Sequence, residues 1–402
     1  AEAIMKMCFG NGIGFEYDID TAADAGGQDA FVQKLFGNSY GAFLLEVAAG
    51  ADELCAPGCG FTTKVLGQTA EAAEIALGAE KVLLAELLQK YEEKLEPVYP
   101  CNIEATKQQI PALRFEAKER VRLVEFGAAQ IAAAKPKVLI PAFPGTNCEY
   151  DSAKALEAAG AETEIIVIRN LTADAIAASI DEFAGKVADS QMLFIPGGFS
   201  GGDEPDGSGK FIIAFFRNPA VRDAVTDMLD RRGGLMAGIC NGFQALIKLG
   251  LVPYGKIIDT DETCPTLTFN EIGRHQSRLV RIRVASNKSP WLARTEVGEI
   301  YTVPVSHGEG RLLAGEELLR ELGAGGQLAT QYVDFDGNPA DDIRFNPNGS
   351  AFAVEGMTSP DGRVFGKMGH AERVGYGLYR NVPGRYDMKM FESAVEYFRA
   401  TT

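Results

Sequence analysis

The stretch that decides the fold of this chain is Gly238-Ile239-Cys240-Asn241-Gly242-Phe243-Gln244. It follows the apolar run 235–237 and leads into the helical pattern 245–249, which predicts a strand, a sharp turn and a helix. A turn of this kind holds Cys240 at a helix N-terminus, where backbone N–H groups favour thiolate over thiol. The flanking glycines suit a tight elbow, because larger side chains would collide with neighbouring elements. We therefore predict that Cys240 is a nucleophile; the alternative is a buried, inert cysteine.

Three histidines are available as a base for this thiol: His275, His307 and His370. His370 stands two residues before Glu372, after the β-leaning residues 363–365, and an extended chain would turn both side chains to one face. Glu372 would then fix the imidazole tautomer while the other ring nitrogen takes the thiol proton. We predict a relay of Cys240, His370 and Glu372; the alternative is a surface His-x-Glu pair without a partner.

A glycine turn that follows the buried-strand pattern 192–195 is the candidate oxyanion hole. Its sequence is Gly197-Gly198-Phe199-Ser200-Gly201-Gly202-Asp203. Backbone N–H groups in such a turn can hold an oxygen that gains charge. We predict that the N–H groups of Gly198 and Asn241 do so. Glycine turns are frequent, so this motif is informative only together with the elbow at Cys240.

Taken together, three motifs resemble the class I, triad-type glutamine amidotransferases: Pro196 to Asp203, Gly238 to Gln244, and His370-Ala371-Glu372-Arg373. Further segments are similar to the glutaminase region of phosphoribosylformylglycinamidine synthase, namely 142–149, 304–311 and 346–350. The resemblance covers residues 137 to 400. It implies that Cys240 hydrolyses glutamine through a thioester. It also implies that the ammonia serves a synthetase, which uses ATP and Mg²⁺ to convert phosphoribosylformylglycinamide to the amidine in purine biosynthesis.

The resemblance also suggests residues that contact the substrate. Gln244 matches a position that contacts glutamine, and Phe199 and Ser200 are expected to line the glutamine pocket. His307 and Glu309 lie in a motif typical of this family. Three roles for them stay open: shaping the ammonia exit, contacting the synthetase, or a structural histidine in a loop. We keep His307 out of the catalytic relay.

Two departures from the family pattern concern local geometry. The family usually has Pro-His-Pro-Glu-Arg where this chain has Gly369-His370-Ala371-Glu372-Arg373, and the loss of two prolines removes local stiffness. Ile272, His275 and Gln276 also differ from the family's residues in the segment 269–278. Contacts made by that segment are therefore not carried over.

The 402 residues predict two or three domains. Residues 1–100 mix a glycine turn at 10–14 that precedes a strand, a strand at 42–47 and a helix at 83–91, which is an α+β pattern. They resemble the end of the AIR synthetase-like domain in the long, fused form of the synthase, so we expect a longer parent polypeptide. Residues 101–136 are interpreted as a connector with an amphipathic helix at 115–134. Residues 137–402 are interpreted as the glutamine amidotransferase domain.

The amidotransferase region alternates between strand and helix patterns. Strands are expected at 138–140, 164–168, 192–195 and 235–239, and helices at 151–159, 173–183 and 220–229. Short apolar strands joined by helices predict an α/β fold with a parallel, flavodoxin-like sheet flanked by helices. Gly145, Gly197 and Cys240 then fall at the carboxyl ends of strands, where ligands bind. Strand patterns at 279–284 and 299–303 predict an antiparallel extension.

Composition excludes several classes of function. A net charge of −16 disfavours a nucleic-acid or anionic-membrane partner, and no apolar run is long enough to span a bilayer. Seven irregularly spaced cysteines do not suggest a disulfide framework, and Cys55 and Cys59 lack a second pair for zinc. We expect a cytoplasmic protein with no metal or cofactor of its own. Its expected partners are glutamine and the rest of the synthetase.

Three hypotheses from different classes remain at this point. The first is the glutaminase part of a purine-synthesis ligase. The second is the glutaminase domain of another amidotransferase, or a related thiol hydrolase of the same fold, and the synthetase-like residues 1–100 argue against it. The third is a non-catalytic docking module, which has no need for Cys240, His370 and Glu372 together.

Overall fold

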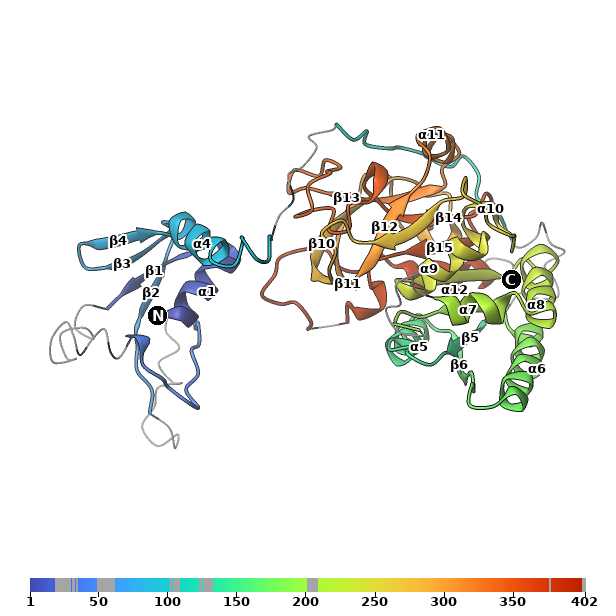
Figure 1. The fold of residues 1–402 in the computed structure, drawn as a ribbon, viewed down its shortest axis with the longest axis horizontal. Coiled ribbons are helices and arrows are strands. Elements are labelled where there is room, and N and C mark those ends of the chain that lie inside the picture. The colour runs from blue at the N-terminus through green and yellow to red at the C-terminus, as the bar shows by residue number, and fades with distance from the viewer. Residues whose placement is uncertain are drawn as a thin grey trace. The chain divides into compact units, whose positions relative to one another are not determined.

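The computed structural model describes residues 1–18, 30, 33, 35–48, 62–101, 103, 109–122, 125, 133–200, 209–375 and 377–399. The chain divides into two compact units, residues 1–101 and 102–402 (Figure 1). Cys55, Cys59 and the segment 201–203 of the glycine turn lie outside the described residues.

The first unit contains a four-stranded sheet in the order β2-β1-β3-β4. Its elements are α1 (Glu2–Asn11), β1 (Gly14–Tyr17), β2 (Gly67–Ala70), β3 (Glu74–Leu77), β4 (Glu80–Leu83) and α4 (Leu84–Glu93). The predicted turn before a strand is present, because Gly12 (φ 68°) ends α1 just before β1. The predicted helix at 83–91 is α4. The predicted strand at 42–47 is wrong: residues 42–48 form no strand, and Phe43 is 89% exposed, whereas Leu44 packs against the core of this unit.

The second unit is built on one nine-stranded sheet in the order β11-β10-β13-β14-β15-β8-β7-β5-β6. Its strands are β5 (Lys137–Ala142), β6 (Glu162–Val167), β7 (Met192–Ile195), β8 (Leu235–Ile239), β10 (Gln276–Val284), β11 (Ile300–His307), β13 (Leu328–Val333), β14 (Val354–Thr358) and β15 (Val364–Lys367). A separate pair, β9 (Thr266–Phe269) and β12 (Glu309–Leu313), is antiparallel. Every residue of β7 and β8 is buried, as expected for parallel strands covered on both faces. The predicted α/β sheet is therefore confirmed.

Helices cover the parallel half of this sheet. They are α5 (Glu149–Ala158), α6 (Ala173–Asp189), α7 (Lys210–Phe216), α8 (Pro219–Asp230), α9 (Asn241–Leu249) and α12 (Met390–Arg399). Between α9 and α12 in the sequence are α10 (Leu251–Tyr254) and α11 (Glu316–Ala324). The chain passes through α5 on its way outward from β5 to β6, and through α6 on its way back to β7. Because such crossovers are right-handed, α5 and α6 lie on opposite faces of the sheet. Helix α12 packs with α5, whereas α6, α8, α7 and α9 contact one another in that order. In the described part of the chain, no helix is long and apolar enough to cross a membrane.

The antiparallel extension predicted from 279–284 and 299–303 is confirmed as β10 and β11. The extension continues through β13 and β14 to β15, which turns back to run parallel to β8. In this register Lys367 lies beside Ile239. The chain just after β15 is therefore brought next to Cys240, although 130 residues of sequence separate them.

The strand order also defines a switch point between β5 and β7. From β5 the chain goes outward to β6 and then returns to β7, so the loops after β5 and β7 lead away on opposite faces. These two loops pair through an isolated bridge between Thr146 and Gly198. Ligand sites are expected at such a point.

The predicted helix at 115–134 is wrong in its first half. Phe115 forms a parallel bridge to Ser286, its N–H donates to the Ala285 carbonyl at 2.8 Å, and residues 116–122 contain no helix. The Arg120 side chain binds the carbonyls of Asn287 and Ala293. These contacts hold the chain extended along the domain surface, which outweighs its alanine-rich helix pattern. Residues 123, 124 and 126–132 lie outside the described residues.

Candidate active site

Cys240 lies at the junction of β8 and α9 in a backbone conformation that is rare for a side-chain-bearing residue, with φ 52° and ψ −106°. The predicted elbow is therefore present. Its glycines are required by space: a Cβ on Gly242 would lie 2.1 Å from the Ile195 carbonyl oxygen, and one on Gly238 would lie 2.6 Å from the Gly242 backbone. The Cys240 side chain is buried, and its Sγ lies 3.8 Å from the Ser306 carbonyl oxygen.

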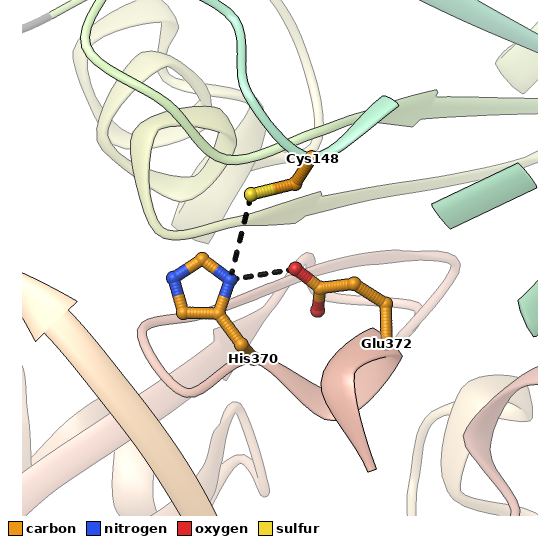
Figure 2. A group of neighbouring side chains, drawn as sticks. All are labelled: Cys148, His370 and Glu372. Atoms are coloured by element: carbon orange, nitrogen blue, oxygen red, sulfur yellow. Dashed lines mark hydrogen bonds and ion pairs between the residues drawn. The ribbon is translucent and has the colours of Figure 1, made fainter. Parts of the chain in front are cut away.

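His370 and Glu372 form a buried pair just after β15. His370 Nδ1 lies 2.6 Å from Glu372 Oε1, and the other ring nitrogen, Nε2, points away from that carboxylate (Figure 2). The prediction of an extended segment here is wrong, because a 3₁₀ turn, η6 (Ala371–Arg373), begins directly after His370. The turn folds the Glu372 carboxylate back to the ring, so the pair does not depend on strand alternation.

The elbow and the pair meet at Gly197, the second residue after β7. A Cβ placed on Gly197 would lie 2.7 Å from His370 Cε1 and 3.5 Å from Cys240 Cβ. The Cys240 N–H also donates to the Lys367 carbonyl at 2.8 Å, which ties the elbow to β15. The structure thus brings Cys240, His370 and Glu372 together around a position that only glycine can fill.

Electrostatics in this cluster favour the charged pair. Burial alone would lower the pKa of His370, but the Glu372 carboxylate and hydrogen bonds to the Cys148 and Cys240 thiols raise that pKa well above its ordinary value. Burial alone would raise the pKa of Glu372, but His370 and Arg373 hold it below its ordinary value. An imidazolium held in this way stabilises a neighbouring thiolate.

Of the predicted oxyanion-hole residues, Gly198 lies on the loop after β7, and Asn241 directly follows Cys240. In the bridge between Gly198 and Thr146, it is the Phe199 N–H that donates, to the Gly145 carbonyl at 2.8 Å. The Gly198 N–H therefore has no backbone acceptor among the described residues. Asn241 is the first residue of α9, so the helix does not use its N–H. The Ser200 N–H donates to Asn241 Oδ1 at 3.2 Å, which joins the loop after β7 to the start of α9.

The predicted substrate-contacting residues differ in their surroundings. Gln244 is buried, and its amide is bonded at both ends: Nε2 donates to the Glu309 carbonyl at 2.6 Å, and Oε1 accepts from Asn241 Nδ2 at 2.9 Å. Ser200 is buried, and its Oγ has no partner within the described structure. Phe199 is half-buried, with its ring 6.0 Å from that of His275.

His307 ends β11 and is 1% exposed. Asn270 Nδ2 donates to the carbonyls of His307 and Arg274, so Asn270 Oδ1 is the atom that faces His307 Nδ1, 3.1 Å away. Nδ1 therefore carries the proton, and the buried Nε2, which has no partner among the described residues, is a bare lone pair. Burial, with the nearby His370 and His275, lowers the pKa of His307 to about 3. This histidine is neutral and separate from the His370–Glu372 pair.

The sequence reasoning missed Cys148 as a neighbour of the base. Its Sγ lies 3.9 Å from His370 Nδ1 (Figure 2). The same sulfur accepts a hydrogen bond from the Arg373 guanidinium at 2.9 Å. Cys148 is the N-cap of α5 in the loop after β5, and Cys240 is likewise the N-cap of α9. That position at the switch point was the available signal.

Cys148, His370 and Glu372 also form a possible metal-ligand set, since one ligand atom of each lies within 4.8 Å of the others. A thiolate, an imidazole and a carboxylate suit Zn²⁺. However, the Arg373 guanidinium at the Cys148 sulfur places a positive charge where the cation would bind. The expectation of no metal remains a prediction.

Comparison with known proteins identifies the family of the larger unit. Residues 135–398 match the CobB/CobQ-like glutamine amidotransferase domain. The phosphoribosylformylglycinamidine synthase subunit PurQ of Methanococcus maripaludis is 34% identical over 281 residues, which cover 65% of this chain and 97% of that subunit. The PurQ subunit of Dehalococcoides mccartyi is 35% identical over 279 residues, 66% of this chain and 99% of that subunit. A solved structure of PurLQS from Thermotoga maritima is 26% identical with a TM-score of 0.47, covering 65% of this chain and 99% of that one.

Proposed function

Because the chain belongs to the CobB/CobQ-like glutamine amidotransferase family, we propose that it is the glutaminase part of a phosphoribosylformylglycinamidine synthase. Residues 135–398 would release ammonia from glutamine for purine biosynthesis, and we propose a cytoplasmic location for the enzyme. For residues 1–101, the resemblance to an AIR synthetase-like domain supports a role as part of the synthetase.

The first half of the reaction forms a thioester. The Cys240 thiolate attacks the side-chain amide carbon of glutamine, and the N–H groups of Gly198 and Asn241 hold the oxygen as it gains charge. The C–N bond then breaks, and the His370 imidazolium gives its proton to the leaving nitrogen, which departs as ammonia. The buried Glu372 carboxylate keeps the ring oriented by its bond to Nδ1.

The second half releases glutamate. Neutral His370 takes a proton from water, and the hydroxide attacks the thioester carbon. The C–S bond breaks, and Cys240 returns to the thiolate beside the imidazolium. The sum is glutamine and water to glutamate and ammonia. The ammonia would pass inside the protein to the synthetase, whose ATP and Mg²⁺ activate the formamide oxygen, since in bulk water ammonia is mostly protonated at neutral pH.

The observation that carries this proposal is the meeting of Cys240, His370 and Glu372 around Gly197. It supports a thiol that is deprotonated by an oriented imidazole, which is the chemistry a glutaminase needs. A docking module gains nothing from a strained cysteine beside a buried ion pair.

The test uses a diazo ketone analogue of glutamine as an active-site label. We expect one label per chain, on Cys240. Cys148→Ala should still be labelled there, and Cys240→Ala should be neither labelled nor able to release glutamate. With its synthetase part present, Cys240→Ala should still carry out the ammonia-dependent reaction. Label on Cys148, or glutamate release that survives in Cys240→Ala, would contradict the proposal.

A further inference from the structure

Lys367 and Glu355 form an ion pair in the interior, on the neighbouring strands β15 and β14. Both side chains are 0% exposed, and Lys367 Nζ lies 3.0 Å from Glu355 Oε1. Such a pair is weak support for stability, because removing two charges from water costs about as much as their attraction returns. Its position in the fold therefore needs another explanation.

The pair binds both the N–H and the carbonyl of Gly369, the residue directly before His370. Lys367 Nζ donates to the Gly369 carbonyl at 2.8 Å, and the Gly369 N–H donates to Glu355 Oε1 at 2.7 Å. The other carboxylate oxygen of Glu355 accepts from Thr330 Oγ1 at 2.5 Å. The His370 N–H in turn donates to the Pro304 carbonyl at 2.9 Å. The backbone that carries the imidazole is thus fixed on both sides.

Only glycine suits position 369 if these hydrogen bonds are to form. A proline has no N–H to donate to Glu355. Any Cβ at this position would lie 2.7 Å from Val303 Cγ1 and 2.9 Å from Glu355 Oε1. The buried ion pair therefore supplies, through hydrogen bonds, the stiffness that the Gly369-His370-Ala371 sequence lacks.

The same lysine also contacts the nucleophile loop. Its carbonyl accepts the Cys240 N–H at 2.8 Å, while its ammonium group holds the loop of the base. One residue therefore touches the backbones of both reacting groups. A small shift of Lys367 changes the distance between the thiol and the imidazole.

We propose that Lys367 and Glu355 are positioning residues that set the geometry of His370 relative to Cys240. This inference rests on the proposed glutaminase function and adds two residues to it. Their side chains bind Gly369, Thr330 and each other, and not the Cys240 thiol or the His370 ring. Their effect is on how often the thiol and the imidazole stand at reactive distance.

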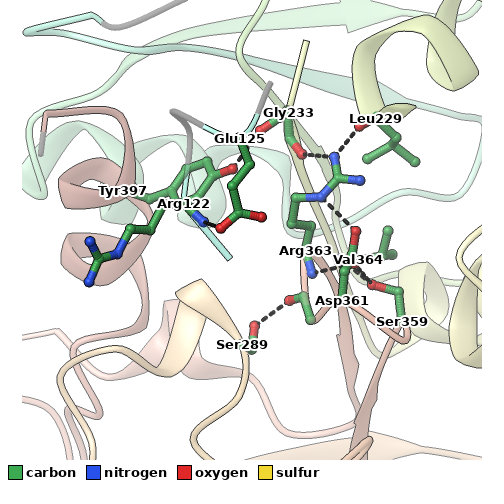
Figure 3. Close-up of polar contacts among 12 residues, drawn as sticks. Arg122, Glu125, Leu229, Gly233, Ser289, Ser359, Asp361, Arg363, Val364 and Tyr397 are labelled. Atoms are coloured by element: carbon green, nitrogen blue, oxygen red, sulfur yellow. Dashed lines mark hydrogen bonds and ion pairs between the residues drawn. The ribbon is translucent and has the colours of Figure 1, made fainter. Parts of the chain in front are cut away.

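A charged pair at the opposite end of β15 provides a matched control. There Arg363 binds Asp361 at 2.7 Å and also donates to the Leu229 carbonyl (Figure 3). The Arg363 side chain is 7% exposed and stands directly before β15, and it contacts the end of α8, the Gly234 carbonyl and the turn before β15. An Arg363→Met variant should therefore lose stability without moving His370.

The experiment compares Lys367→Met, Glu355→Ala, the double variant and Arg363→Met. Each single variant at the pair leaves one buried charge and should lower the urea midpoint. The double variant should regain most of it, because an apolar replacement of a buried pair is often neutral. We expect the double variant to keep a kcat for glutamine hydrolysis that is roughly 10- to 100-fold low, with KM changed by less than about threefold. Arg363→Met should keep kcat within about threefold of wild type.

Several outcomes are decisive. A double variant that regains both stability and wild-type kcat shows that the pair is only structural and overturns the proposal. If that variant does not fold, Lys367→Met decides, because it removes the group that donates to the Gly369 carbonyl: a wild-type kcat in it also overturns the proposal. Wild-type chain that neither releases glutamate nor takes the diazo ketone label at Cys240 contradicts the glutaminase function itself.

Discussion

Cys148 Sγ and His370 Nδ1 lie 3.9 Å apart in the interior, on the side of the ring that Glu372 also contacts. Two thiols therefore share one imidazole, and only one of them, Cys240, sits in the strained elbow. The hydrogen bond that the protonated ring donates to Cys148 helps to raise the pKa of His370. Cys148 is in this view a group that tunes the base and is not itself the nucleophile.

We predict that Cys148→Ala lowers the pKa of His370 without removing activity. The alkaline limb of the kcat/KM profile for glutamine should move to lower pH, because the imidazolium loses one of the groups that stabilise it. The measurement is the pH dependence of glutamate release from about pH 5 to 10, a range that spans the ordinary pKa values of histidine and cysteine. A shift to higher pH, or none, would contradict this account of Cys148.

The sequence predicted the elements that carry the nucleophile better than those that carry the base. The runs that became β7 and β8 are continuous and apolar and end in glycine turns, so both their type and their carboxyl ends could be read from pattern alone. Strand β13 was missed because Thr330 and Gln331 interrupt its apolar pattern. Both residues are buried and hydrogen-bonded, which only the fold reveals.

In the candidate site, too, some residues could be predicted from the sequence and others only from the fold. Cys240 and the pair of His370 with Glu372 could be proposed from residue type and spacing. The pair, however, forms through a 3₁₀ turn and not through the extended chain that the spacing suggested. Cys148 and Lys367 could not be found in this way, because their contacts with His370 and Gly369 depend on which strands are neighbours in the sheet.

A Glu372→Gln variant should lose most of its glutaminase activity while remaining folded. The amide keeps the shape of the carboxylate but not its charge, so the imidazolium is less stable and the tautomer is no longer fixed. A kcat roughly 10²- to 10⁴-fold below wild type is expected. The control is Glu316→Gln, an exposed helix residue paired with Arg320, which should keep wild-type kcat.

The same substitution should change the pH dependence of stability. His370 has a raised pKa, so its contribution is complete below its ordinary value of 6.5 and is lost as pH rises through the folded value. Glu372 has a lowered pKa, so its contribution is complete above 4.5 and is lost as pH falls through the folded value. The difference in unfolding free energy between wild type and Glu372→Gln should therefore be largest between pH 4.5 and 6.5. Urea unfolding at several pH values measures it, and a maximum at alkaline pH would contradict the assignment.

His307→Gln should remove part of the acid sensitivity of the fold. The pKa of His307 is about 3 in the folded chain, so the unfolded chain binds the extra proton as pH falls from 6.5 toward 3. Stability therefore decreases with acid over that range, by up to a few kcal/mol at about 1.4 kcal/mol per pKa unit. Replacement by a residue that does not titrate should flatten the dependence. Equal slopes in the two proteins, measured by urea unfolding, would show that His307 protonates without cost.

A Gly197→Ala variant should lose activity, because Gly197 lies where Cys240 and His370 meet. The added methyl group would lie 2.7 Å from His370 Cε1, 3.2 Å from Cys148 Sγ and 3.5 Å from Cys240 Cβ, so the ring must shift from its place in the site. Because a displacement of about 1 Å costs up to roughly 10²-fold in rate, we expect a large loss of kcat. The matched control is Gly185→Ala in α6, where an added Cβ meets nothing within 4 Å. That variant should gain roughly 0.5–1 kcal/mol of stability from helix propensity and keep wild-type kcat. Glutamate release and thermal unfolding of both variants test the pair, and a fully active Gly197→Ala would show that the thiol and the imidazole do not meet there.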